Sequence, residues 1–221
     1  MHAPAQARAV GLTVVAAVLG LLTVSCGSGS SGSSTRPESS ASRATAEHGY
    51  EAAYDAGWRE GRRIFKDGGK GSAVREAVWG GCVRRSLTAE PQIVVEKDRG
   101  AWVLGCKQGV GTRKDRHPPA RPVTRREADP DLLARFRSWA DTNGFKQPAR
   151  DVGQVVLVHL GDGDYDVEVS TAYTDKNTEA EVRRLANAFV TWWDGDDGDK
   201  ATAWNLIVAA QDGKRLVTVK L

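Results

Sequence analysis

The sequence predicts an α+β fold in two parts. Residues 47–110 are expected to form a small disulfide-stapled helical unit, because apolar residues recur there every three or four positions. Residues 129–221 are expected to form a helix-strand-strand-helix-strand-strand domain with two helices on one face of an antiparallel sheet, because helix-period stretches alternate with pairs of strand-like stretches joined by Gly-containing turns. A chain of 221 residues is long enough for one ordinary domain or two small ones.

Residues 1–25 have the composition of a secretory signal peptide. Arg8 is the only permanently charged side chain in residues 1–9, and residues 10–24 then run apolar and small without a charge. A helix of that apolar stretch would span roughly 22 Å, less than the roughly 30 Å hydrocarbon core of a bilayer. The sequence therefore favours a cleaved signal peptide over a permanent transmembrane helix.

The end of this stretch, Leu22-Thr23-Val24-Ser25-Cys26, resembles the lipobox of bacterial lipoproteins, from which it departs at Thr23, where leucine is usual. The resemblance implies that Cys26 carries a diacylglyceryl thioether after cleavage. The protein is then lipid-anchored on the extracytoplasmic face of the cell membrane, because two acyl chains give stable anchoring. The alternative is an ordinary secreted protein cut at the same bond, since Thr23 and Ser25 also satisfy the small-x-small rule.

The cysteine count supports the anchored interpretation. The chain has three cysteines, an odd number for an exported protein. If a lipid occupies Cys26, then Cys82 and Cys106 remain to form a disulfide in an oxidising compartment. In the chain-entropy model, such a bridge stabilises the fold by about 3 kcal/mol.

Residues 26–46 are expected to form a flexible tether. The segment is rich in Gly and Ser and has no aromatic residue, so it cannot build a core. Its length would hold the folded part roughly 25 Å from the lipid.

Three helices are expected in the helical unit. The first carries an aromatic stripe with two glycines on the same face, and glycines there indicate that another element approaches closely. The stripe comprises Tyr50, Tyr54, Trp58, Phe65, Gly57 and Gly61. The second and third helices are expected over residues 72–87 and 98–108, and the disulfide would join them. A unit with so few large aliphatic residues needs such a bridge.

Residues 111–128 are expected to be a basic, Pro/Arg-rich linker without hydrophobic periodicity. Two interpretations remain open: the linker lies against anionic lipid or wall polymer, or it is solvated and pairs loosely with the acidic domain of its own chain. Nucleic acid is not expected as a partner, because the protein is exported, its net charge is only +3, and no aromatic residue is interleaved in the linker.

The second part carries the clearest local signals. Asp129 and Pro130 are the N-cap and first residue of an apolar-striped helix, and Thr178 with Glu181 forms a capping box before a second one. Residues 155–160 are a continuous apolar strand. The alternation in residues 165–173 is expected to leave Asp166 and Glu168 in solvent, and an Asp212-Gly213 turn joins the last two strands.

No motif indicates a catalytic site, a metal site or a cofactor. His48, His117 and His159 form no constellation, and His159 is expected to be a core histidine with a hydrogen bond. Zinc-hydrolase, nucleophile-elbow, Walker and Rossmann motifs are absent from the sequence. The acidic clusters at residues 162–166 and 194–199 raise the alternative of a calcium-stabilised module, but their spacing departs from the EF-hand loop.

The sequence thus predicts a monomeric envelope lipoprotein that binds an envelope protein or a cell-wall polymer without catalysing a reaction. The alternative function is an envelope hydrolase whose carboxylates are brought together only by the fold.

Overall fold

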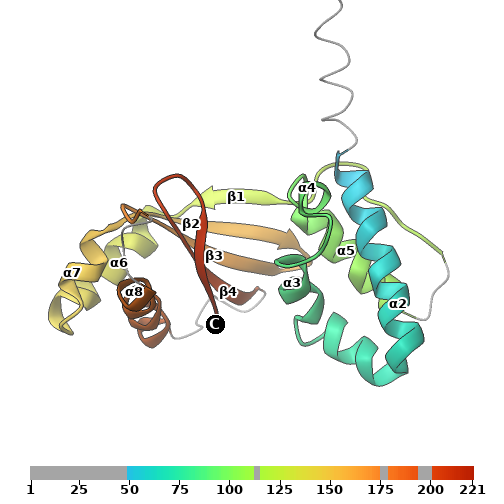
Figure 1. Cartoon of the computed structure of the whole chain (residues 1–221), viewed down its shortest axis with the longest axis horizontal. Helices are drawn as coiled ribbons and strands as arrows, with labels where there is room; N and C mark the ends of the chain where they lie inside the picture. Colours follow the sequence, from blue (N-terminus) through green and yellow to red (C-terminus); the bar gives the residue numbers. More distant parts are fainter. Residues whose placement is uncertain (1–48, 112–114, 175–178, 194–200) are drawn as a thin grey trace, which may run out of the picture. The chain divides into compact units, whose positions relative to one another are not determined.

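The computed structural model describes residues 49–111, 115–174, 179–193 and 201–221. All of them belong to the compact unit Glu38–Leu221, which combines helices with a five-stranded mixed sheet and so confirms the α+β class (Figure 1). The expected signal peptide, the lipidation site Cys26 and the tether lie outside the described residues. Among the described helices, none combines the length and apolar character that crossing a membrane requires.

Four helices form the first layer: α2 (Gly49–Ala77), α3 (Gly81–Ser86), α4 (Gln92–Val95) and α5 (Arg99–Val110). The expected close approach at Gly57 and Gly61 is confirmed, and the partner is α5. A Cβ on Gly57 would overlap the carbonyl oxygen of Trp102, and one on Gly105 of α5 would overlap the carbonyl oxygen of Tyr54. Both helices therefore need glycine where their backbones meet.

The predicted helix over residues 72–87 is wrong. Helix α2 continues to Ala77 past a kink at Gly69, whose φ is 61°. The chain then turns at Gly80, which has a φ of 69° and packs so closely on the ring of Trp204 that a Cβ there would overlap it. Only glycine adopts this conformation against such a neighbour without strain, so a new helix, α3, begins at Gly81.

The predicted disulfide is confirmed. Cys82 in α3 is bonded to Cys106 in α5, with their Cα atoms 5.8 Å apart, and both residues are fully buried. The bridge fixes a six-residue helix that is too short to be stable by itself.

The sheet has the order β1-β2-β3-β4-β5. Its strands are β1 (Arg125–Ala128), β2 (Val152–Gly161), β3 (Asp164–Thr171), β4 (Thr202–Ala209) and β5 (Arg215–Lys220). The two predicted hairpins, β2–β3 and β4–β5, are antiparallel. Strands β3 and β4 pair in parallel, unlike the expected fully antiparallel sheet, because the helix α8 (Glu179–Trp192) carries the chain back between them.

Part of the expected linker is ordered structure. Arg125–Ala128 forms the edge strand β1 against β2. Val123 and Thr124 directly precede β1. Their backbone N–H groups donate to the buried carboxylate of Asp98, at 2.7 and 2.9 Å. The same carboxylate caps α5 by accepting from Ala101 N–H at 3.0 Å. The chain that leads to the sheet is therefore tied to the start of α5.

Helices cover both faces of the sheet (Figure 1). Helices α6 (Pro130–Thr142), α7 (Lys146–Arg150) and α8 bury one face, with Phe136 and Phe189 at the centre of that core. Asp129 caps α6 as predicted, accepting from Leu132 N–H at 2.8 Å. The opposite face of β2 packs against the α2–α5 layer through Val156, Val158 and Leu160.

Candidate functional site

The acidic residues of β3 lie against the α2–α5 layer, and the expectation that Asp166 is solvated is wrong. Asp166 is fully buried; it accepts a hydrogen bond from Arg99 of α5 and another, at 2.7 Å, from the side-chain amide of Asn205. Burial raises the pKa of Asp166 and lowers the pKa of Arg99. Both partners lose hydration on burial, so an ion pair like this one is weak evidence for added stability relative to apolar side chains.

Asp164 is engaged in the same way. It accepts hydrogen bonds from Lys107 of α5 and, at 2.8 Å, from the indole N–H of Trp204. The cations that meet Asp164 and Asp166 both come from α5, so these two carboxylates dock that helix onto the sheet. The third acid of β3, Glu168, accepts a hydrogen bond from Arg126 of β1 at 2.6 Å. In the parts of the chain that the structure describes, no three His, Cys, Asp or Glu side chains are grouped to hold a metal ion. The acidic cluster at residues 194–199 lies outside the described residues.

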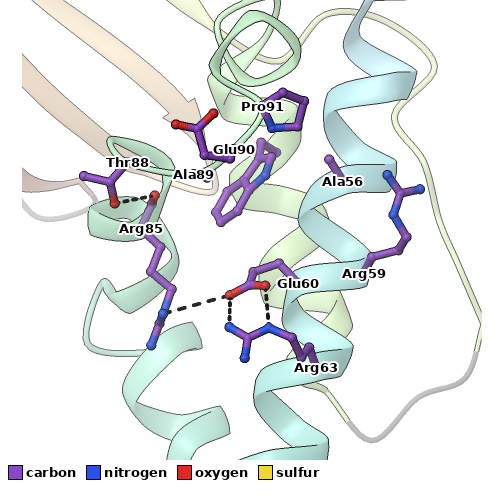
Figure 2. A pocket seen from close by; sticks show the side chains of 10 residues that line it. Ala56, Arg59, Glu60, Arg63, Arg85, Thr88, Ala89, Glu90 and Pro91 are labelled. Carbon is purple, nitrogen blue, oxygen red and sulfur yellow. Dashed lines mark hydrogen bonds and ion pairs between the residues drawn. The ribbon is translucent and has the colours of Figure 1, made fainter.

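A pocket of about 480 Å³ opens between α2 and the α3–α4 connection (Figure 2). Its wall combines small apolar surfaces with side chains of both charges. The apolar residues are Ala56, Ala89, Pro91 and Trp102, and the polar ones are Arg59, Glu60, Arg63, Arg85, Thr88 and Glu90. Six of the ten lining residues are polar or charged, so this pocket is more polar than a usual small-molecule site and suits a charged ligand.

Arg85 is held rigidly at the pocket wall. Its Nε and one Nη donate to the two carboxylate oxygens of Glu76, at 2.9 and 3.1 Å, and Glu76 is only 2% exposed. These hydrogen bonds raise the pKa of Arg85. Figure 2 shows Arg85 reaching from α3 toward Glu60 on α2. The second Nη forms an ion pair with a Glu60 oxygen 4.0 Å away, which is too far for a hydrogen bond, so its N–H groups can still donate to a ligand.

The acids of the pocket are not arranged for acid–base catalysis. Glu60 accepts two hydrogen bonds from Arg63, at 2.9 and 2.6 Å, and these lower its pKa. Glu90 is exposed. A general acid needs a raised pKa, which comes from burial away from cations. The pocket therefore offers fixed charges rather than a proton donor.

Arg59 is a pocket cation whose guanidinium group is available to a ligand. It is exposed on α2, and no described residue forms a hydrogen bond or ion pair with it. Arg59 on α2 and Arg85 on α3 are thus two guanidinium groups in the pocket lining. Guanidinium groups match the planar, two-oxygen geometry of a carboxylate.

The histidines do not meet at a site. His48 lies outside the described residues, and His117 is exposed beside α5. His159 lies on β2 with its Nε2 unpaired and 3.6 Å from a Glu127 oxygen, so that nitrogen lacks the hydrogen bond expected of a core histidine. Burial, then the nearby charge of Arg125, lowers the pKa of His159.

Sequence reasoning missed the pocket residues. Charged side chains on an exposed helix are normally solvated, and no spacing links Arg59 on α2 to Arg85 on α3. The one available signal was the glycine pair on α2, which marks where that helix is covered.

No protein-family model, curated protein or solved structure matches the chain significantly.

Proposed function

We propose that the chain is a lipid-anchored extracytoplasmic lipoprotein whose folded part is a non-enzymatic binding module, and that the α2/α3 pocket is its ligand site. The lipobox-like sequence before Cys26 supports the anchor. The Cys82–Cys106 disulfide is what an oxidising, extracytoplasmic compartment permits. The observation that carries the binding site is Arg85, a guanidinium pre-oriented by a buried carboxylate, with donors left free at a pocket wall.

The pocket chemistry fits a ligand that carries a carboxylate next to a small apolar group. Arg59 and Arg85 would bind the carboxylate, while Trp102 and Pro91 supply apolar surface. Envelope polymers with peptide side chains and acidic segments of envelope proteins have this chemistry. The ligand is thus a carboxylate-bearing envelope component.

The hydrolase alternative has less support. Glycoside hydrolysis needs two carboxylates that flank the scissile bond. Asp164 and Asp166 do not line the pocket and are each held by a cation of α5, and Glu60 is paired with Arg63.

The anchor is tested by the intact mass of the protein extracted from membranes. We expect residues 1–25 to be missing, a diacylglyceryl group to be added at Cys26, and two hydrogens to be absent because of the disulfide. If the protein is soluble and Cys26 is unmodified, the chain is an ordinary secreted protein. If residues 1–25 are still present, the proposal that the chain is exported and cleaved before Cys26 is wrong.

The pocket is tested by calorimetric binding of soluble peptidoglycan fragments with free carboxylates. Arg59→Ala is expected to weaken binding roughly 10-fold, because it removes one charge-assisted contact. It should not change stability, since Arg59 contacts no described partner. Arg85→Ala should weaken binding at least as much.

The matched control is Arg183→Ala on α8. Arg183 is exposed, and its one ion-pair partner among the described residues is Glu179, four residues earlier on the same helix. Its removal should leave the affinity unchanged, and fragments with amidated carboxylates should bind wild type as weakly as they bind Arg59→Ala. Equal affinities of wild type and Arg59→Ala would exclude the pocket as the site for this ligand.

A further inference from the structure

Helix α2 ends in an exposed apolar group, here called the apolar tip and formed by Val74, Val78 and Trp79. These side chains are 47%, 62% and 62% exposed. Among the described residues, only one other large hydrophobic side chain is exposed, Ile93. Val74 and Val78 are one helical turn apart, with Val78 N–H donating to the Val74 carbonyl at 2.9 Å. A contiguous exposed group of this kind marks an interaction surface.

The orientation of the apolar tip is fixed by the fold. After the Gly69 kink, Ala73 and Ala77 pack against the core, and Glu76 is buried against Arg85. With these residues turned inward, the helical period turns residues 74 and 78 outward. The end of α2 thus turns its paired carboxylate inward and Val74 outward, and the turn that follows adds Val78 and Trp79 to the exposed apolar surface.

Basic side chains flank the apolar tip in the sequence. Lys66, Lys70 and Arg75 are exposed on α2, and Arg75 pairs with Glu76. Arg84 donates to the carbonyl oxygen of Trp79 at 2.7 Å. The acids of this stretch are also paired, Asp67 with Arg63 and Glu76 with Arg85. Apolar and tryptophan side chains flanked by cations are the composition of a surface that binds anionic membranes.

We propose that the apolar tip inserts into the interfacial region of the anionic bilayer to which Cys26 anchors the chain. This inference rests on the proposed anchor. The stretch between Cys26 and Gly49 can extend to roughly 75 Å, whereas the 29 residues of the kinked helix α2 span at most about 42 Å. The tip can therefore reach the membrane surface while the chain remains anchored. Insertion would orient the domain, and hence its pocket, relative to the envelope.

The experiment uses the full acylated chain in vesicles, with an environment-sensitive fluorophore attached through Val78→Cys. The native cysteines are occupied by the acyl group and the disulfide, so labelling is selective. In vesicles containing phosphatidylglycerol, we expect a blue shift and a rise in emission of about two-fold, as for a probe entering the interface. Vesicles of phosphatidylcholine alone should give little change.

Two matched controls separate insertion from other effects. The same fluorophore at Ile93→Cys reports an exposed apolar position on α4, outside the apolar tip, and its emission should not change. The double variant Lys66→Glu, Lys70→Glu should reduce the response at position 78 to the level seen in phosphatidylcholine.

Several outcomes would overturn the proposal. One is an unchanged fluorophore at position 78 on an acylated chain in anionic vesicles. Another is a response that rises with protein density in phosphatidylcholine or in detergent, which would mean that the tip joins copies of the chain. Intact mass is measured first, so a missing acyl group counts against the anchor, whereas a silent probe on an acylated chain counts against the tip alone.

Discussion

Gly57→Ala is expected to lower the free energy of unfolding by about 3 kcal/mol, near the upper end of what overpacking costs. The added methyl group would overlap the backbone carbonyl of Trp102, and a backbone cannot rotate away as a side chain can. Helices α2 and α5 would have to separate. Because Trp102 lines the pocket, ligand binding should weaken together with stability. Urea denaturation with the disulfide intact measures the change.

Gly71→Ala is the matched control on the same helix. Nothing lies within 4 Å of a Cβ built at Gly71, so the methyl group costs no packing. Alanine is favoured over glycine inside a helix by about 1 kcal/mol, so this variant should be neutral or slightly more stable. If the two substitutions had equal effects, the close crossing of α2 and α5 would not be what requires glycine.

Local sequence patterns were sufficient to predict several elements of the fold. The start of α6 followed from Asp129 and Pro130, and the β2–β3 hairpin from its alternation and its glycine turn. The disulfide followed from counting cysteines in an exported chain. Each of these depends on residues close together in the chain, or on a single chemical constraint.

The two-sided burial of the sheet was not predicted, although one signal for it existed. Five of residues 155–160 of β2 are apolar, His159 being the exception, and such a nearly continuous apolar run is the pattern of a strand covered on both faces. The alternation in β3 indicated a solvated face instead, because Asp166 is charged. Its partner, Arg99, lies 67 residues earlier in the chain, and no local pattern connects them.

Strand β1 and the pocket could not be predicted from local sequence patterns either. All four residues of β1 are exposed, so the strand has no apolar period, and only backbone pairing with β2 creates it. The guanidinium of Arg85 is oriented by the buried Glu76, nine residues away across the turn at Gly80. Both features depend on tertiary contacts rather than on residue type.

Arg99→Met is expected to lower the free energy of unfolding by about 4 kcal/mol. Methionine keeps most of the apolar stem but leaves the fully buried Asp166 without its cation. Asp166→Asn in the same background removes the unpaired charge while keeping an oxygen that can accept from Asn205. The double variant should therefore be roughly 2 kcal/mol more stable than Arg99→Met alone, as a double-mutant cycle would measure.

The pH dependence of Arg99→Met distinguishes an unpaired charge from lost packing. Burial already raises the folded-state pKa of Asp166 above its unfolded value, and removing Arg99 takes away a group that opposes that rise. Between the two pKa values the folded state binds more protons than the unfolded state, so stability falls as pH rises through that window. The deficit of Arg99→Met should therefore be smaller at about pH 5 than at about pH 8. A deficit independent of pH would mean that the guanidinium serves only to fill space between α5 and β3.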